Sequence, residues 1–155
     1  MRLRHGSRWF FALTIAAAAL STAASQNKKP SISVKANPPV GFTPLRVVVT
    51  AELKGGNDDY EEFYCASVEW EWGDGTRSEN KIDCDPYVAG KSEIKRRYVQ
   101  EHMFRSFPMD TAAGVSTPEG PAQYRVKFSL KQKNKTVGSG QTTVEVRNGG
   151  GFGGH

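Results

Sequence analysis

The chain has 155 residues, enough for one ordinary domain, with 21 basic and 16 acidic side chains. Its first 25 residues hold three arginines and no acid, so the remainder carries 21 − 3 = 18 basic residues against 16 acidic ones, a net charge of +2. Nucleic-acid-binding domains usually carry a large positive charge or a stripe of basic residues with aromatic residues between them. This chain has neither feature after residue 25, so we expect no nucleic-acid partner.

Residues 1–25 have the layout of a secretory signal peptide, with a basic start, an apolar run at 9–20 and small residues at 21–25. The alternative is a membrane anchor, but this run of 12 residues, apolar except for Thr14, is shorter than the ~20 that span a bilayer. We therefore expect cleavage after Ala24 or Ser25, a secreted or periplasmic protein, and no membrane span in the mature chain.

Several segments of the remaining chain alternate apolar and polar residues with a period of two, the pattern of half-buried strands. They lie at 31–35, 45–53, 65–72, 124–130 and 141–146. Segment 92–104 fits either a helix capped by Ser92 or a strand, and its neighbours favour the strand. About seven short strands predict an all-β fold with two packed sheets over 26–147, followed by a flexible Gly-rich tail at 148–155.

The same alternation predicts which side chains face the core. In 65–72 one face carries Ala66, Val68, Trp70 and Trp72, and the opposite face carries Cys65, Ser67, Glu69 and Glu71. In 124–130 the inward residues are Tyr124, Val126, Phe128 and Leu130. Large aromatic residues dominate this predicted core.

Four motifs in this order resemble the signature of PKD domains (the polycystic kidney disease repeat), an immunoglobulin-like β-sandwich. They are Gly41 with Pro44, the run "WEWGDG" at 70–75, His102 with Phe104, and Tyr124 with Val126. The resemblance covers nearly the whole predicted domain, and its fold-signature residues are Trp70, Trp72, Gly73, Asp74, Gly75, His102, Phe104 and Tyr124.

The resemblance implies a two-sheet immunoglobulin-like sandwich that serves as a non-catalytic extracytoplasmic module and contacts proteins or carbohydrates. Two intervals depart from the family pattern: 26 residues separate Gly75 from His102, and 19 separate Phe104 from Tyr124. Both are longer than is usual in the family, so the ligands of its loops do not carry over to this chain.

Cys65 and Cys84 are the two cysteines, and in an exported protein such a pair predicts a disulfide. A two-residue turn centred between Asp74 and Gly75 would set Cys65 directly opposite Cys84, since 65 + 84 = 73 + 76 = 149. A one-residue bulge would spoil this register. The alternative is a pair of reduced thiols.

The predicted topology sorts the loops into two ends of the domain. One end collects the turn at 38–43, the Gly-Asp-Gly turn and the long loop 105–123; the other collects the acidic loop 55–62 and the basic loop 131–135. Long loops on a compact sandwich are often functional, so we name Phe107, Pro108 and Met109 as a candidate partner-binding surface. The alternative is a flexible insertion without a partner.

Three groups of residues could carry chemistry. Asp58, Asp59, Glu61 and Glu62 offer oxygen ligands for Ca²⁺, although an ordinary polar loop tip is the alternative and no other cofactor is expected. Asp74 is expected to bond the amides of its own turn, with Gly73 and Gly75 at positive φ. His102 has no matching nucleophile, and we expect it to pack under this turn and hydrogen-bond it.

No acid–base or nucleophile constellation is apparent, so the sequence predicts a protein that is not an enzyme. We expect a binding or adhesion module with a protein or glycan partner at the cell surface or envelope. The alternative functions are a structural subunit or spacer of an envelope assembly, and a carbohydrate-binding accessory. The sequence does not specify an oligomeric state.

Overall fold

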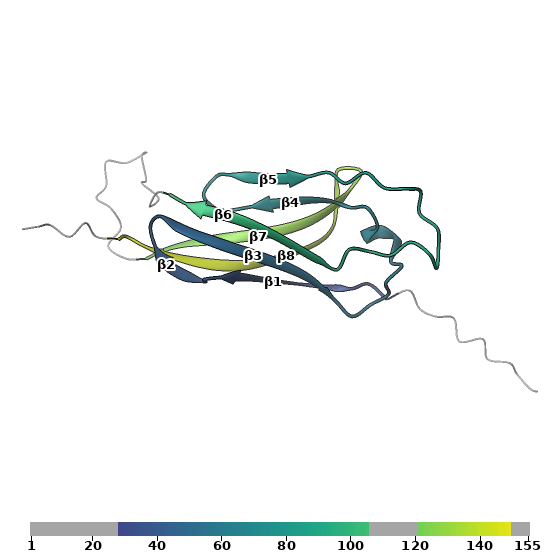
Figure 1. The fold of residues 1–155 in the computed structure, drawn as a ribbon, viewed down its shortest axis with the longest axis horizontal. Coiled ribbons are helices and arrows are strands. Elements are labelled where there is room, and N and C mark those ends of the chain that lie inside the picture. The colour runs from purple at the N-terminus through teal and green to yellow at the C-terminus, as the bar shows by residue number, and fades with distance from the viewer. Residues whose placement is uncertain (1–27, 106–120, 150–155) are drawn as a thin grey trace, which may run out of the picture.

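A computed structural model describes residues 28–105 and 121–149 (Figure 1). Within these residues eight strands form two sheets. One short 3-10 helix, η1 at Glu61–Phe63, lies between β3 and β4. The predicted all-β fold with two sheets is therefore confirmed, with eight strands in place of about seven. The predicted signal peptide at 1–25 and the end of the tail, 150–155, lie outside the described residues.

The smaller sheet has the antiparallel order β1-β3-β6, with β1 at Ser31–Asn37, β3 at Leu45–Lys54 and β6 at Arg97–Phe104. Buried and solvent-facing residues alternate along all ten positions of β3, as its period of two predicts. The ambiguous segment 92–104 is a strand from Arg97 onward, because its buried residues Tyr98 and Phe104 keep this alternation while pairing with β3.

The larger sheet has the order β2-β8-β7-β4-β5. Its strands are β2 at Val40–Phe42, β4 at Ser67–Glu71, β5 at Arg77–Asn80, β7 at Ala122–Gln132 and β8 at Lys135–Arg147. The short β2 lies inside the stretch predicted to be only a turn, and it pairs parallel to β8. Hydrogen bonds from Glu145 to Pro39 and from Thr43 to Arg147 extend this pairing on both sides.

The hydrophobic core lies between the two sheets. Ring pairs connect β6 of the smaller sheet to β7 of the larger one: Tyr98 with Phe128 at 5.2 Å and Phe104 with Tyr124 at 4.6 Å between ring centroids. Every residue predicted to face inward from 65–72 and 124–130 is buried, namely Ala66, Val68, Trp70, Trp72, Tyr124, Val126, Phe128 and Leu130.

The sheets approach each other most closely where β1 lies against β8. A Cβ placed on Gly138 would meet Ile32 at 2.8 Å, and one on Gly140 would meet Val34 at 2.8 Å. The absence of side chains at these two positions of β8 thus makes room for β1. In the order of the smaller sheet, β1 and β6 are the two edge strands.

The predicted disulfide Cys65–Cys84 is present, with the two Cα atoms 6.0 Å apart. The register predicted for it is wrong by one residue, because Glu71 pairs with Arg77 rather than Ser78. The amide of Trp72 donates to the carbonyl of Thr76 at 3.1 Å, so the turn contains three residues instead of two. The disulfide forms nonetheless because the regular β4–β5 pairing starts only at Val68, and the cysteines lie in the irregular chain beyond it.

Among the described residues, no helix has the length and apolar character needed to cross a membrane.

Candidate functional site

Most signature residues meet at the end of the molecule where β4 turns into β5. We call Trp72, Asp74, Thr76 and His102 the Asp74 cluster. The turn supplies the first three residues, and β6 of the opposite sheet supplies His102. The cluster therefore ties the two sheets together at this end.

The carboxylate of Asp74 has a partner at each oxygen. Oδ1 accepts hydrogen bonds from the amide of Thr76 at 2.9 Å and from its hydroxyl at 2.6 Å. Oδ2 accepts one from Nε2 of His102 at 2.7 Å. Burial alone would raise the pKa of Asp74, but the hydrogen bonds from Thr76 and His102 outweigh it and hold this pKa below its usual value. The predicted role of Asp74 within its own turn is confirmed, with φ of 83° at Gly73 and 87° at Gly75.

His102 lies between the turn and the core. Its ring stacks on Trp72 with centroids 4.3 Å apart and meets the ring of Phe104 edge-on at 4.8 Å. Only 17% of its side chain and 20% of the Asp74 side chain are exposed, although the backbone of the turn is open to solvent. The prediction that His102 packs under the turn and hydrogen-bonds it is confirmed.

The order of groups in the Asp74 cluster differs from that of a catalytic triad. A triad needs the histidine between the acid and the attacking hydroxyl, so that the ring can take the hydroxyl proton. Here the acid is in the middle, because both the hydroxyl of Thr76 and the ring of His102 bond to Asp74. The arrangement fixes a turn rather than activating a nucleophile.

Two of the four acids proposed as calcium ligands have other side-chain partners. Asp58 accepts a hydrogen bond from Nε of Arg96 at 2.5 Å, and Glu62 forms an ion pair with Lys29 at 3.8 Å. Across 28–105 and 121–149, no group of three or more His, Cys, Asp or Glu side chains is placed to hold a metal ion. Calcium binding by Asp59, Glu61 and their neighbours stays a prediction from ligand type alone.

The acidic loop 55–62 and the basic loop 131–135 lie at the same end of the molecule, as predicted. At this end the amide of Gln132 bonds to the carbonyl of Tyr64. Lys131 pairs with Glu69 on the neighbouring strand at 2.6 Å instead of with the acidic loop. Phe107, Pro108 and Met109, the predicted partner-binding surface, lie outside the described residues.

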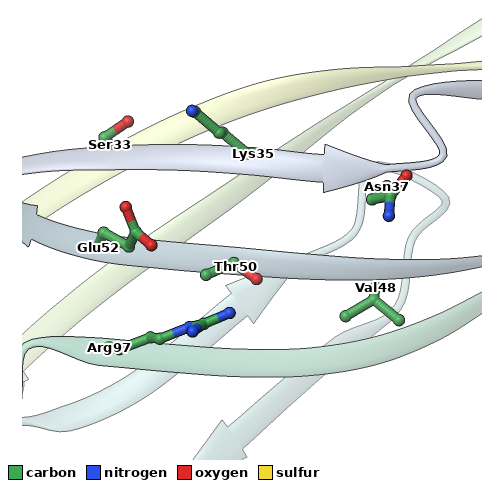
Figure 2. A pocket seen from close by; sticks show the side chains of 7 residues that line it. All are labelled: Ser33, Lys35, Asn37, Val48, Thr50, Glu52 and Arg97. Atoms are coloured by element: carbon green, nitrogen blue, oxygen red, sulfur yellow. The ribbon is translucent and has the colours of Figure 1, made fainter.

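A second region, which the sequence did not single out, is a groove on the solvent face of the smaller sheet. Figure 2 shows the side chains that line it, standing along three neighbouring strands. The groove has a volume of about 320 Å³. We call it the β1–β3–β6 groove, and its lining residues are Ser33, Lys35, Asn37, Val48, Thr50, Glu52 and Arg97.

Strand register brings these residues together. Ser33 lies opposite Glu52, Lys35 opposite Thr50, and Asn37 opposite Val48, while Arg97 flanks Glu52 from the other side. They are the solvent-facing half of strands whose other half forms the core. The signal in the sequence was therefore the polar phase of the alternation, which indicates a surface but gives no hint that this part of the surface is concave.

The groove offers polar groups that the protein does not use itself. Within the described residues, the side chains of Ser33, Lys35, Asn37, Thr50 and Arg97 have no hydrogen bond or ion pair, and Glu52 has only a 3.9 Å ion pair with Lys54. Two cations, one carboxylate, two hydroxyls and an amide are thus available to a ligand. None of the described residues that line the groove is aromatic.

Few known proteins are similar to this chain. No protein family matches the chain, and no curated protein is similar to it. One similar solved structure is the Pseudomonas fluorescens alkylpurine DNA glycosylase AlkC bound to DNA containing an abasic site analog, with 15% sequence identity and a TM-score of 0.37. The match covers 77% of this chain and 31% of that one. At this similarity, no property of the glycosylase is transferred to this chain.

Proposed function

We propose that this chain is a non-catalytic extracytoplasmic binding module with an immunoglobulin-like, PKD-type sandwich fold. The strand order supports the fold: β1, β3 and β6 would be strands A, B and E, and β8, β7, β4 and β5 would be G, F, C and C′. The chain also changes sheets between β1 and β2, which then pairs parallel to β8.

Two features support a location outside the cytoplasm. The first is the resemblance of residues 1–25 to a secretory signal peptide. The second is the disulfide Cys65–Cys84, since disulfides persist in oxidising compartments and are rare in the cytosol. The protein would act in the periplasm or outside the cell.

The observation that carries the binding role is the β1–β3–β6 groove with its unused polar side chains. A protein partner suits it better than a glycan, because sugar-binding faces usually present aromatic rings for stacking and none of the described lining residues is aromatic. Hydroxyl, amide, cationic and acidic groups at neighbouring register positions suit the polar rim of a protein–protein interface. The partner would be a protein of the cell surface or envelope.

Affinity capture from an envelope extract tests this role. The baits are the wild-type chain, a Lys35→Glu/Asn37→Ala variant in the groove, and a Lys91→Glu/Asn80→Ala control with the same changes of charge and size at exposed positions elsewhere. We expect wild type and control to recover the same proteins and the groove variant to lose them. Equal recovery by all three baits would contradict binding through the groove.

A structural role as a spacer is the second candidate, and the positions of the chain ends favour it. The chain enters β1 at one end of the molecule and leaves β8 at the other (Figure 1). A module whose ends lie far apart can extend a chain of attached domains. Fusing reporter domains to both ends and measuring their separation by energy transfer would test this: close reporters would exclude a spacer.

A further inference from the structure

Strand β6 is an open edge of the smaller sheet. The amide of Leu53 donates to the carbonyl of Arg96 at 2.8 Å, and Ala51 lies opposite Tyr98 in the same register. Because hydrogen-bonded pairs alternate along an antiparallel ladder, Tyr98, Gln100 and His102 direct their backbone groups to β3. The residues between them direct theirs away from the sheet.

We call Arg97, Val99 and Glu101 the β6 edge. Among the described residues, the recorded bond to their outward backbone groups is a 3.4 Å contact from the side-chain amide of Gln100 to the carbonyl of Glu101. The side chains are exposed as well, and Val99 keeps 53% of its surface in solvent. An edge with free amides and carbonyls is a template on which another strand can pair.

We propose that the β6 edge pairs with the β6 edge of a second copy of this chain, antiparallel about a two-fold axis through Val99. In this register the two Val99 residues face each other. Arg97 of each copy lies opposite Glu101 of the other, so one contact is made twice, as a two-fold interface requires. All three facing pairs are hydrogen-bonded pairs of the ladder.

Charge complementarity selects this register over its neighbours. An axis through Arg97 or Glu101 would place like charges directly opposite each other, which is unfavourable in a sheet. An axis through Tyr98 or Gln100 would leave Arg97 opposite Val99 or Met103. The axis through Val99 alone matches both charged residues of the edge and joins two half-exposed valines.

The charges on β3 fit the same arrangement. Arg46 already forms an ion pair with Glu101, and Glu52 lies opposite Arg97 in the β3–β6 register. Pairing two copies would therefore place each edge charge among groups of opposite sign. It would also join the two smaller sheets, so that the grooves of Figure 2 lie on one continuous six-stranded face.

This inference does not rest on the proposed binding function, although Arg97 belongs to both the groove and the β6 edge. The variants that test the binding role leave β6 unchanged, so the two proposals fail separately. Sedimentation velocity on the full chain over a wide range of concentration tests the self-pairing of β6. We expect a monomer–dimer equilibrium for wild type. Arg97→Glu alone or Glu101→Arg alone should lower the association constant by about tenfold or more, because each creates two like-charge contacts per dimer.

Mixing the two variants gives the sharpest test of the register. A copy with Arg97→Glu has acids at both edge positions, and a copy with Glu101→Arg has bases at both, so the mixture should form a heterodimer about as tightly as wild type. A Val99→Pro variant, which removes an outward amide that β3 does not use, should also lose the dimer, whereas Val99→Thr should keep it.

Circular dichroism should show folded strands in each variant. The proposal is overturned if wild type sediments as a monomer at every concentration, or if the mixture of charge variants does not associate. A wild-type chain that stays monomeric but pairs with an extended peptide from another protein would mean that the β6 edge serves a different occupant, and would equally overturn self-pairing.

Discussion

The Asp74 cluster and the β1–β3–β6 groove contain similar chemical groups in opposite states. In the cluster, both carboxylate oxygens of Asp74 are bonded, and His102 is held between Trp72 and the turn. In the groove, the side chains of Lys35 and Thr50 have no partner within the described residues. Saturated polar groups stabilise a fold, whereas unsaturated exposed ones remain available for recognition.

The residues that stand out in the sequence are not the ones that are free to bind a partner. The "WEWGDG" run attracts attention because it combines tryptophans with acids and glycines. Its tryptophans face the core and Asp74 bonds its own turn, while Glu71 pairs with Lys127 on the outer face of the sheet. The run thus defines the shape of this end of the sandwich. The groove residues are ordinary members of alternating strands, and they matter only because three strands bring them side by side.

Truncation of Trp72 should lower the stability of the fold more than any other change proposed here. Trp72 is fully buried and stacks on both Trp70 and His102. Trp72→Ala should lower the free energy of unfolding by about 3–5 kcal/mol. The matched groove change, Val48→Ala, should cost only about 0.5 kcal/mol. Urea unfolding of both variants measures the difference, and similar losses would refute the assignment of stability to the cluster.

The two glycines of the turn provide the next contrast. Both have positive φ, but a Cβ on Gly73 would lie 2.8 Å from the carbonyl oxygen of Arg125, whereas one on Gly75 meets nothing within 4 Å. Gly75→Ala should cost about 1 kcal/mol for the left-handed backbone alone. Gly73→Ala should cost roughly 2 kcal/mol or more, since β7 must also move. Thermal unfolding should separate them, and equal melting temperatures would show that the turn does not press on β7.

Acid should weaken the cluster through Asp74. Its pKa lies below the usual value in the folded protein, so the ionised form stabilises the fold. This contribution is complete above about pH 4 and is lost as the pH falls through the folded-state pKa. Between about pH 5 and pH 3 wild type should therefore lose more unfolding free energy than Asp74→Asn, whose amide does not titrate. Parallel acid limbs in urea titrations of the two proteins would contradict this role.

The sequence predicted the core and the cluster better than the loops and edges. Period-two alternation identified the inward residues of β4 and β7, because burial on one face imposes that pattern. The contact between His102 and its turn was also predicted, since a polar residue at the end of an aromatic strand needs a local partner.

Features that depend on long-range geometry were not predictable in the same way. The β4–β5 register was wrong because the Gly-Asp-Gly turn allows either two or three loop residues, and the amide of Trp72 selects three. Strand β2 was missed because only its pairing with β8 makes it a strand. The groove was missed because residues of three strands line it together, and no single strand encodes that arrangement.

The smallest expected change in stability comes from Lys35→Ala, and it tests whether the groove and the Asp74 cluster are independent. Lys35→Ala removes an exposed side chain without a partner, so the unfolding free energy should change by no more than about 0.5 kcal/mol. Combined with Asp74→Asn, its effect should add within about 0.5 kcal/mol, because no contact joins the two residues: Lys35 lies on β1 of the smaller sheet, and Asp74 lies in the turn between β4 and β5 of the larger one. A larger coupling energy in this double-mutant cycle would show that the cluster holds the groove in shape. In that case the residues that define the fold would also control recognition, and the groove could not be treated as a separate surface.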